Sequence, residues 1–284
     1  MANVTDATWT LRFDGSSTAA SSGAGIVLFR NDGEAIPKSF KLDFPCSNNV
    51  AEYEAYLTEL AVAWEMGIKH LKVVEDSNLI VCQARGEFSL KEPSLAPYRA
   101  LAQKLEAKFI TFEIEHAQRN ENRYADALAT LGSQMAFEGQ KIDITINKKV
   151  KPITELLKKE FEESSLDEED WRMPLKAKLM SLVAATDFKE IKDYTLISGE
   201  LYRRLPGGVL ARCISILEVK RKLIEVHEKT CEGGRGISLY CRLQRLGYYW
   251  PNMSREAANL QSQCLTCQLQ HDNEEVYATF VSTD

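Results

Sequence analysis

Residues Leu71–Val81 have the sequence "LKVVEDSNLIV". Its first half predicts a buried strand over 71–75, and its second half begins a helix over 77–85. Asp76 and Ser77 stand between the two, where short polar residues commonly cap the next helix. A carboxylate at the end of a buried strand also suits a metal site, if other carboxylates converge on it. The role of Asp76 therefore depends on where the other acids lie.

Residues 1–133 predict an α/β domain. Three strands in succession form an antiparallel meander, and helices then alternate with two further strands. The expected strands cover 9–14, 25–29, 40–44, 71–75 and 109–116, and the expected helices cover 50–66, 77–85, 94–107 and 122–132. This order implies a mixed five-stranded sheet with helices on both faces.

The rest of the chain divides into two further parts. Residues 134–170 lose the pattern and end in the acidic run "EFEESSLDEED", which indicates a solvated linker. Residues 171–284 predict a small, mainly helical second domain. Within it, "YTLISGELYRR" (194–204) predicts a hairpin around Gly199.

The composition, 44% hydrophobic and 27% charged, is that of a globular protein. Residues 1–140 carry a net charge of −6 and the remainder is neutral, so a nucleic-acid partner would require metal ions to offset charge. No apolar run is long enough for a membrane span, and "MANVTDATWT" lacks a signal-peptide pattern. We expect an intracellular, reducing compartment; the sequence leaves nucleus or cytoplasm and the oligomeric state open.

Four acids of the first domain stand out by location. Asp14 ends the first strand, Glu52 lies in the first turn of the first long helix, Asp76 ends the fourth strand, and Asp126 lies in the last helix. Each one alone could be a cap, turn or solvated acid. Taken together, they predict a site for two Mg²⁺ or Mn²⁺ ions, because clustered carboxylates repel one another unless divalent cations neutralise them.

Four motifs resemble those of a type 1 ribonuclease H domain, in the version carried by plant gypsy-type retrotransposon polyproteins. They are "FDGSS" (13–17), "NNVAEYEAYLTEL" (48–60), "EDSNLIV" (75–81) and "HAQRNENRYADALATL" (116–131), and the resemblance covers roughly 7–133. It implies two-metal hydrolysis of the RNA strand of an RNA–DNA hybrid. It also implies the site residues: metal ligands Asp14, Glu52, Asp76 and Asp126; a mobile catalytic His116; and substrate-side Asn122, Gly15 and Ser16.

Two features depart from this family. Glu75 stands where related sequences usually have Gly, and its charge either perturbs the site or points to solvent. The segment "GEFSLKEP" (86–93) leaves no room for the basic protrusion of some relatives. Hybrid binding would then rest on the metals, the edge of the sheet and a partner domain.

The second domain contains His227 and a Cys264-x-x-Cys267 pair, which together indicate part of a zinc site. A redox role for this pair is disfavoured because its surroundings predict helices. "GYYWPNM" (247–253) and "CLTCQ" (264–268) resemble the N-terminal zinc-binding domain of retroelement integrases, which has two His and two Cys ligands.

The second histidine of that family should lie seven residues after His227, where this chain has Gly234, followed by Arg235. Neither residue can ligate zinc. Cys231, one helical turn after His227, is the candidate fourth ligand. We expect zinc to bind weakly or not at all unless Cys231 supplies that ligand. The remaining cysteines of this domain, Cys213 and Cys241, are expected to be buried helix residues.

Two functions therefore stay open. The intact carboxylates favour an active ribonuclease H from a retrotransposon-derived polyprotein fragment. The missing histidine favours an inactive retroelement relic that acts at most as a nucleic-acid-binding or interaction module.

Overall fold

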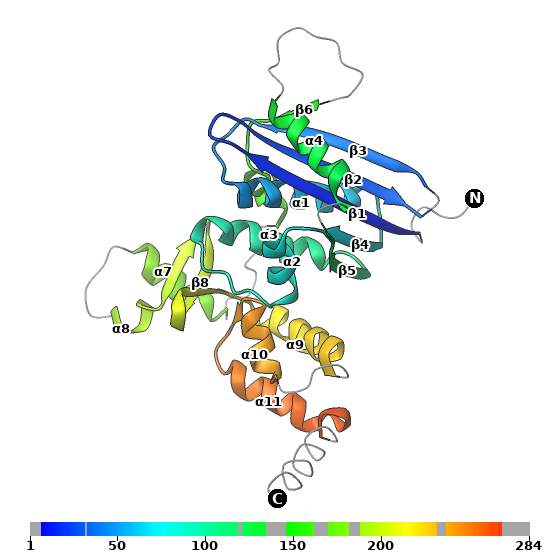
Figure 1. The fold of residues 1–284 in the computed structure, drawn as a ribbon. Helices are drawn as coiled ribbons and strands as arrows, with labels where there is room; N and C mark the ends of the chain where they lie inside the picture. Colours follow the sequence, from blue (N-terminus) through cyan, green and yellow to red (C-terminus); the bar gives the residue numbers. More distant parts are fainter. Residues whose placement is uncertain are drawn as a thin grey trace, which may run out of the picture. The chain divides into compact units, whose positions relative to one another are not determined.

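The structure, a computed structural model, describes residues 7–31, 33–118, 121–134, 146–161, 170–181, 188–231 and 237–268. The chain divides into two compact units (Figure 1). The first comprises 1–85 and 92–164, and the second comprises 86–91 and 165–284. None of the described helices has the length and hydropathy needed to cross a membrane.

The first unit is built on a mixed sheet with the strand order β5-β4-β1-β2-β3-β6. Its strands are β1 (Thr8–Ser17), β2 (Ser22–Arg30), β3 (Ala35–Leu42), β4 (His70–Glu75), β5 (Thr111–His116) and β6 (Ile146–Lys149). The first three strands are antiparallel, whereas β4 pairs with β1, and β5 with β4, in parallel. The predicted meander and mixed sheet are confirmed.

The prediction of five strands was wrong, because β6 adds a sixth strand parallel to β3. Its residues fall within the expected linker 134–170. They join the first unit through Glu54, a fully buried acid of the first helix whose carboxylate lies 3.2 Å from Lys149 Nζ and accepts the backbone N–H of Ile153. The short helices α5 (Ile153–Leu156) and α6 (Lys158–Phe161) follow. Most of the acidic run, at 162–169, lies outside the described residues.

Helices cover both faces of this sheet, as predicted (Figure 1). They are α1 (Asn48–Glu65), α2 (Asn78–Arg85), α3 (Ala96–Glu106) with the short 3-10 helix Pro93–Leu95 before it, and α4 (Arg123–Gln134). α4 packs on β1, β2 and β3, while α1 packs on β1 and β2 from the opposite side. The core on the α1 side includes Phe13, whose ring stacks on Tyr56 at 5.0 Å between centroids.

Two glycines let these helices approach the sheet closely. A Cβ at Gly15 of β1 would overlap the backbone of Ala51 and Glu52 in α1. A Cβ at Gly25 of β2 would overlap the backbone of α4 at Ala125. Since Gly25 is the register partner of Asp14, the close packing of α4 brings the next residue in α4, Asp126, to the same face of the sheet.

The second unit contains a four-stranded sheet with the order β10-β9-β8-β7. Its elements are α7 (Arg172–Met180), α8 (Phe188–Ile191), β7 (Tyr194–Ile197), β8 (Glu200–Leu205), the 3-10 turn Pro206–Gly208, β9 (Val209–Cys213), α9 (Ile216–Cys231), α10 (Leu239–Arg245), β10 (Tyr248–Tyr249) and α11 (Met253–Gln263). The predicted hairpin is confirmed: Ser198 and Gly199, both with positive φ, join β7 to β8.

The prediction of a mainly helical second domain is therefore only partly right. The short strands β9 and β10 show little alternation, so the local pattern predicts the hairpin but not the four-stranded sheet. Cys213 lies on β9 and is buried, which corrects its expected place in a helix, whereas Cys241 lies in α10 and is half-buried.

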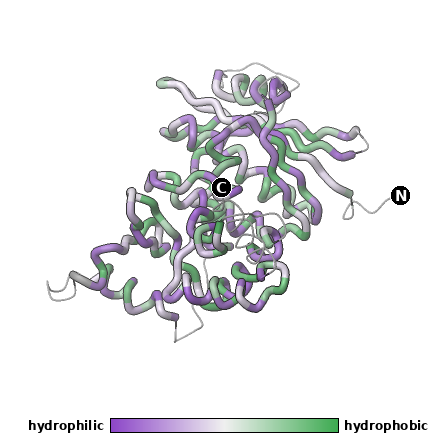
Figure 2. The backbone as a smooth tube through the Cα atoms, turned by 60° about the horizontal axis from the view of Figure 1, so that its bottom comes forward, coloured by the Kyte–Doolittle hydropathy of each residue, from purple (hydrophilic) through white to green (hydrophobic). Residues whose placement is uncertain are grey.

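The helices α9, α10 and α11 pack around one small apolar core. Its buried members are Ile214, Val219, Val226, Leu239, Leu243, Tyr248, Trp250, Met253 and Ala257. In Figure 2, hydrophobic and hydrophilic residues alternate along the helical turns of the chain, as expected for helices that bury one side. A core of this size supplies limited stability by itself.

Candidate active site

The carboxyl ends of β1 and β4 lie side by side because these two strands are parallel neighbours. Asp14 lies near the end of β1, and Asp76 directly follows the last residue of β4, Glu75. Carboxylate oxygens of these three residues lie within 4.8 Å of one another. The structure thus places two of the four predicted metal ligands together and adds a third acid, Glu75.

Glu52 reaches this edge of the sheet from the start of α1. Its Oε2 accepts a hydrogen bond of 2.5 Å from the hydroxyl of Ser77, the residue that follows Asp76. Its Oε1 accepts a hydrogen bond of 2.8 Å from Asn48 Nδ2. Ser77 therefore ties the carboxylate from α1 to the strand end that carries Asp76.

Asp126 approaches from the other side of the sheet, in the first turn of α4, and is exposed. Its charge acts on Asp14, whose pKa is raised to about 7. The largest cause of this rise is burial, followed by the negative charges of Asp126, Asp76 and Glu52. All four predicted carboxylates thus share one local field. A divalent cation would relieve their repulsion, and a set of oxygen donors suits Mg²⁺ or Mn²⁺.

Glu75 is fully buried and directed inward. Its Oε1 accepts the backbone N–H of Ser77 at 3.0 Å. Burial, then hydrogen bonding with Asp76, raises the pKa of Glu75 well above its ordinary value. The solvent-facing interpretation of Glu75 is wrong. A signal for this was available in the sequence, because Leu71, Val73 and Glu75 alternate along β4 and therefore share its buried face.

Asn122 lies behind the carboxylates and is only 2% exposed. Its Nδ2 donates to the Phe13 carbonyl at 2.7 Å and lies 3.2 Å from Asp76 Oδ1 and 3.4 Å from Glu75 Oε2. This amide links the backbone of β1 to the two acids at the end of β4. Its burial favours a positioning role over the direct substrate contact that the resemblance implies.

The other predicted site residues lie at the same edge of the sheet. His116 ends β5, is exposed, and is the register partner of Glu75. Ser16 is half-buried on β1, and Gly15 is buried beneath the start of α1, where it serves the close packing of that helix.

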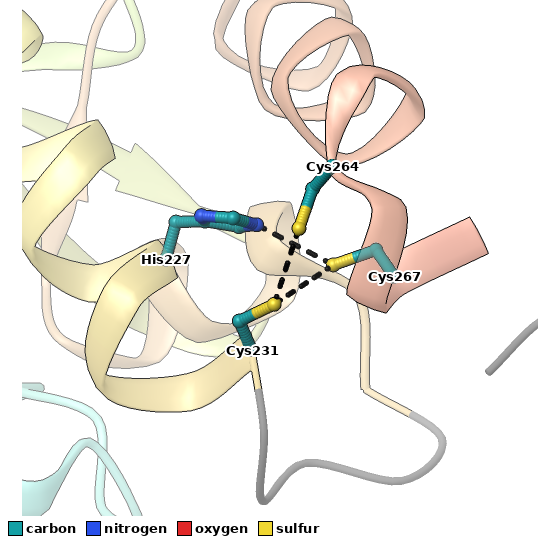
Figure 3. Close-up of side chains that lie close together, drawn as sticks. All are labelled: His227, Cys231, Cys264 and Cys267. Atoms are coloured by element: carbon teal, nitrogen blue, oxygen red, sulfur yellow. Dashed lines mark hydrogen bonds between the residues drawn. The ribbon is translucent and has the colours of Figure 1, made fainter. Parts of the chain in front are cut away.

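A second group of potential ligands forms in the second unit. His227 and Cys231 of α9 meet Cys264 and Cys267 at the end of α11, and one donor atom from each lies within 4.8 Å of the others (Figure 3). Gly234 and Arg235 lie outside the described residues. Cys213 and Cys241 are not members of this group.

The raised pKa of Asp14 predicts that the stability of the folded protein depends on pH. The folded state holds this proton more tightly than the unfolded chain does, so the stabilising contribution is complete below pH 3.8 and is lost as the pH rises through about 7. In metal-free buffer, Asp14→Asn should therefore raise the melting temperature at about pH 8 and flatten its decline between about pH 4 and 8.

Thermal unfolding in EDTA across this pH range measures the effect. Asp43→Asn is a matched control, because Asp43 is exposed and pairs with Lys148 at 2.8 Å, so that its pKa is lowered instead. If the melting temperature of Asp14→Asn falls with pH as steeply as that of the wild type, ionisation of Asp14 is not what destabilises the folded state.

The burial of Glu75 leads to a separate prediction about stability. Glu75→Gln keeps an acceptor for the Ser77 N–H and matches the shape of a protonated carboxyl, so stability should be unchanged or higher. Glu75→Ala removes that acceptor and leaves a buried gap, and should cost about 1–3 kcal/mol. Urea unfolding of both variants tests this. Equal destabilisation by Gln and Ala would mean that the fold needs the charged carboxylate.

Residues 12–132 match the family described as reverse transcriptase-like. Together with the mixed sheet and the carboxylates at its strand ends, this match defines the first unit as a ribonuclease H-like domain. The match covers less than half of the chain.

Particular relatives share this part of the chain. Ribonuclease HI of Halobacterium salinarum is 32% identical over 119 residues, which are 41% of this chain and 60% of that protein. Bifunctional protein Rv2228c of Mycobacterium tuberculosis is 31% identical over 123 residues, 43% of this chain and 34% of that protein. The chain thus spans less than two thirds of the length of either relative.

Solved structures give similar matches. The crystal structure of RNase H1 from Halobacterium salinarum is 30% identical, with a TM-score of 0.42 over 44% of this chain and 96% of that one. LC11-RNase H1 in complex with RNA/DNA hybrid is 27% identical, with a TM-score of 0.40 over 43% of this chain and 94% of that one.

Proposed function

We propose that the first unit is a ribonuclease that cleaves the RNA strand of an RNA–DNA hybrid by two-metal-ion hydrolysis of a phosphodiester. The observation that carries this proposal is the convergence of Asp14, Asp76 and Glu52 with Asp126 at one edge of a ribonuclease H-like sheet. LC11-RNase H1, a similar protein, has been solved with an RNA/DNA hybrid.

The four carboxylates Asp14, Glu52, Asp76 and Asp126 would hold two Mg²⁺ or Mn²⁺ ions. When bound, such ions supply an activated water and stabilise the leaving oxygen of the phosphodiester. The protein residues position the ligands before any ion binds. Ser77 holds Glu52, and Asn122 holds Asp76, so both acids keep a fixed place relative to β1.

His116 would move a proton or assist product release, since it is exposed at the end of β5 beside the strand that carries the acids. Ser16, close to Asp14 along β1, would contact the substrate from the same edge. The RNA strand is selected through its 2′-OH, which DNA lacks. Hybrid binding rests on the metal ions, because residues 1–140 carry a net charge of −6.

We further propose that the chain is a fragment of a retrotransposon polyprotein, with residues 171–284 similar to an integrase zinc-binding domain. The hairpin at 194–204 and the ligands on α9 and after α11 support this. The alternative hypothesis is that the protein is an inactive retroelement relic that at most binds nucleic acid.

Cleavage of a hybrid with a 5′-labelled RNA strand distinguishes the two. The full chain should produce RNA fragments that end in 3′-OH in Mg²⁺ and none in EDTA. A protein that binds the hybrid but leaves the RNA intact in both Mg²⁺ and Mn²⁺ would be the relic.

A further inference from the structure

We propose that His227, Cys231, Cys264 and Cys267 bind one zinc ion as a closed, structural Cys₃His site. This inference lies in the second unit and does not depend on the proposed ribonuclease activity. It also differs from the two-His, two-Cys set expected for the similar integrase domains, because the fourth ligand is a thiolate from α9.

Local structure brings the four side chains to one point. His227 and Cys231 lie four residues apart at the end of α9, so they project from the same side of the helix. Cys264 directly follows α11, and the backbone N–H of Gln268 donates to its carbonyl at 3.0 Å. This single turn places Cys264 and Cys267 on the side that faces α9, as Figure 3 shows.

The separations match a tetrahedral metal site. Cys231 Sγ lies 3.3 Å from Cys264 Sγ and 3.5 Å from Cys267 Sγ, and His227 Nε2 lies 3.4 Å from Cys267 Sγ. Tetrahedral zinc, with Zn–S near 2.3 Å, separates two sulfur ligands by about 3.8 Å and a sulfur from a nitrogen by about 3.6 Å. The four donors thus already stand close to the positions that a single ion requires.

A disulfide does not account for this arrangement. The shortest sulfur–sulfur distance, 3.3 Å, is far longer than the ~2.05 Å of a disulfide bond. None of the seven cysteines, each within the described residues, forms a disulfide in this structure. A disulfide between any two of the three clustered thiols would also leave the third thiol and the imidazole without a shared bonding partner. A metal ion uses all four.

The donor set selects the metal. Thiolates and imidazole favour zinc over magnesium or calcium, which prefer oxygen ligands. Four protein ligands complete the tetrahedron and leave no position for a substrate or a reactive water, which is the arrangement of structural sites.

The site would join α9 to the end of α11, two segments whose Cys231 and Cys264 are 33 residues apart in sequence. Among the described residues, the core between these helices has nine buried members, so it is small for an independent fold. Zinc binding would add folding free energy to this unit, as it does in other small domains with few core residues.

The zinc content and zinc X-ray absorption spectrum of the full chain, purified under reducing conditions, test the proposal. We expect one zinc per chain, with three sulfur neighbours near 2.3 Å and one nitrogen at about 2.0 Å. No zinc after incubation with excess zinc would overturn the site. So would a bound zinc with only two sulfur neighbours, since that would exclude Cys231.

Competition with a chromophoric chelator gives the second measurement. Cys231→Ser should weaken zinc binding more than about 100-fold, since even indirect contacts to zinc ligands contribute 10–100-fold. Cys241→Ser, a change in the neighbouring helix α10, is the matched control and should leave affinity unchanged. Unchanged affinity in Cys231→Ser would overturn the ligand assignment. If this variant fails to fold, the sulfur count of the wild-type protein decides the question.

Discussion

Asp76→Asn is expected to lower the rate of hybrid cleavage in Mg²⁺ more than about 1000-fold, because a metal ligand contributes several kcal/mol to the transition state. The substitution keeps the size of the side chain and an oxygen that can accept from Asn122, which lies 3.2 Å from Asp76 Oδ1. It removes one negative charge from a group of acids within 4.8 Å of one another. The melting temperature in metal-free buffer should therefore be unchanged or higher.

The combination of these two results is the informative outcome. If Asp76 served only to cap α2, Asn would cap equally well, and the variant would keep both its stability and its activity. Asp43→Asn, prepared in parallel, should cleave at the wild-type rate because Asp43 is a surface acid paired with Lys148. Wild-type cleavage by Asp76→Asn would remove this residue from the proposed site.

Substrate choice should show an effect of similar size. RNA paired to DNA should be cut more than about 1000-fold faster than either strand of a DNA duplex of the same sequence, because only RNA offers a 2′-OH at the cleaved position. Residues 1–140 carry a net negative charge, so binding of the hybrid depends on bound metal cations. The cleavage rate at limiting protein should therefore fall steeply as salt is added.

Labelled duplexes that differ only in the sugar of one strand measure this preference directly. A hybrid in which the scissile region alone contains ribonucleotides is the best control, because it should be cut within that region and nowhere else. Comparable turnover of the DNA duplex would assign the first unit a different nuclease specificity.

Much of the first unit could be predicted from its sequence because local pattern and tertiary packing agree there. The alternation of Trp9, Leu11 and Phe13 defines the inward face of β1, and the short stretch from Leu71 to Ser77 contains both a strand and the start of a helix. Parallel pairing of β1 and β4 then brings Asp14 and Asp76 together. The order of the strands is thus predictable from sequence, and so is the edge of the sheet where these acids lie, although β1 continues to Ser17, three residues past its predicted end.

The parts that could not be predicted depend on long-range contacts. β6 has the polar sequence "INKK", and it is held by the buried Glu54 of α1, far away in the chain. Burial of Glu75 follows from strand alternation, yet its partners Ser77 and Asn122 come from a turn and from the residue before α4. Helical spacing from His227 makes Cys231 a candidate ligand, but its approach to Cys264 and Cys267 depends on how α9 meets α11, which no local pattern specifies.

The metal dependence of hybrid cleavage by the wild-type protein and by Asp14→Asn, purified side by side, tests whether the four carboxylates form a metal-dependent nuclease site. Asp14 is the acid whose pKa responds to the other three predicted ligands, so it stands at the centre of the proposed site. Cleavage by the wild-type protein should rise with Mg²⁺ and saturate, while Asp14→Asn should stay at the level of the enzyme-free control at every Mg²⁺ concentration. Equal cleavage by the two proteins, or none by the wild type, would rule out the proposed nuclease site.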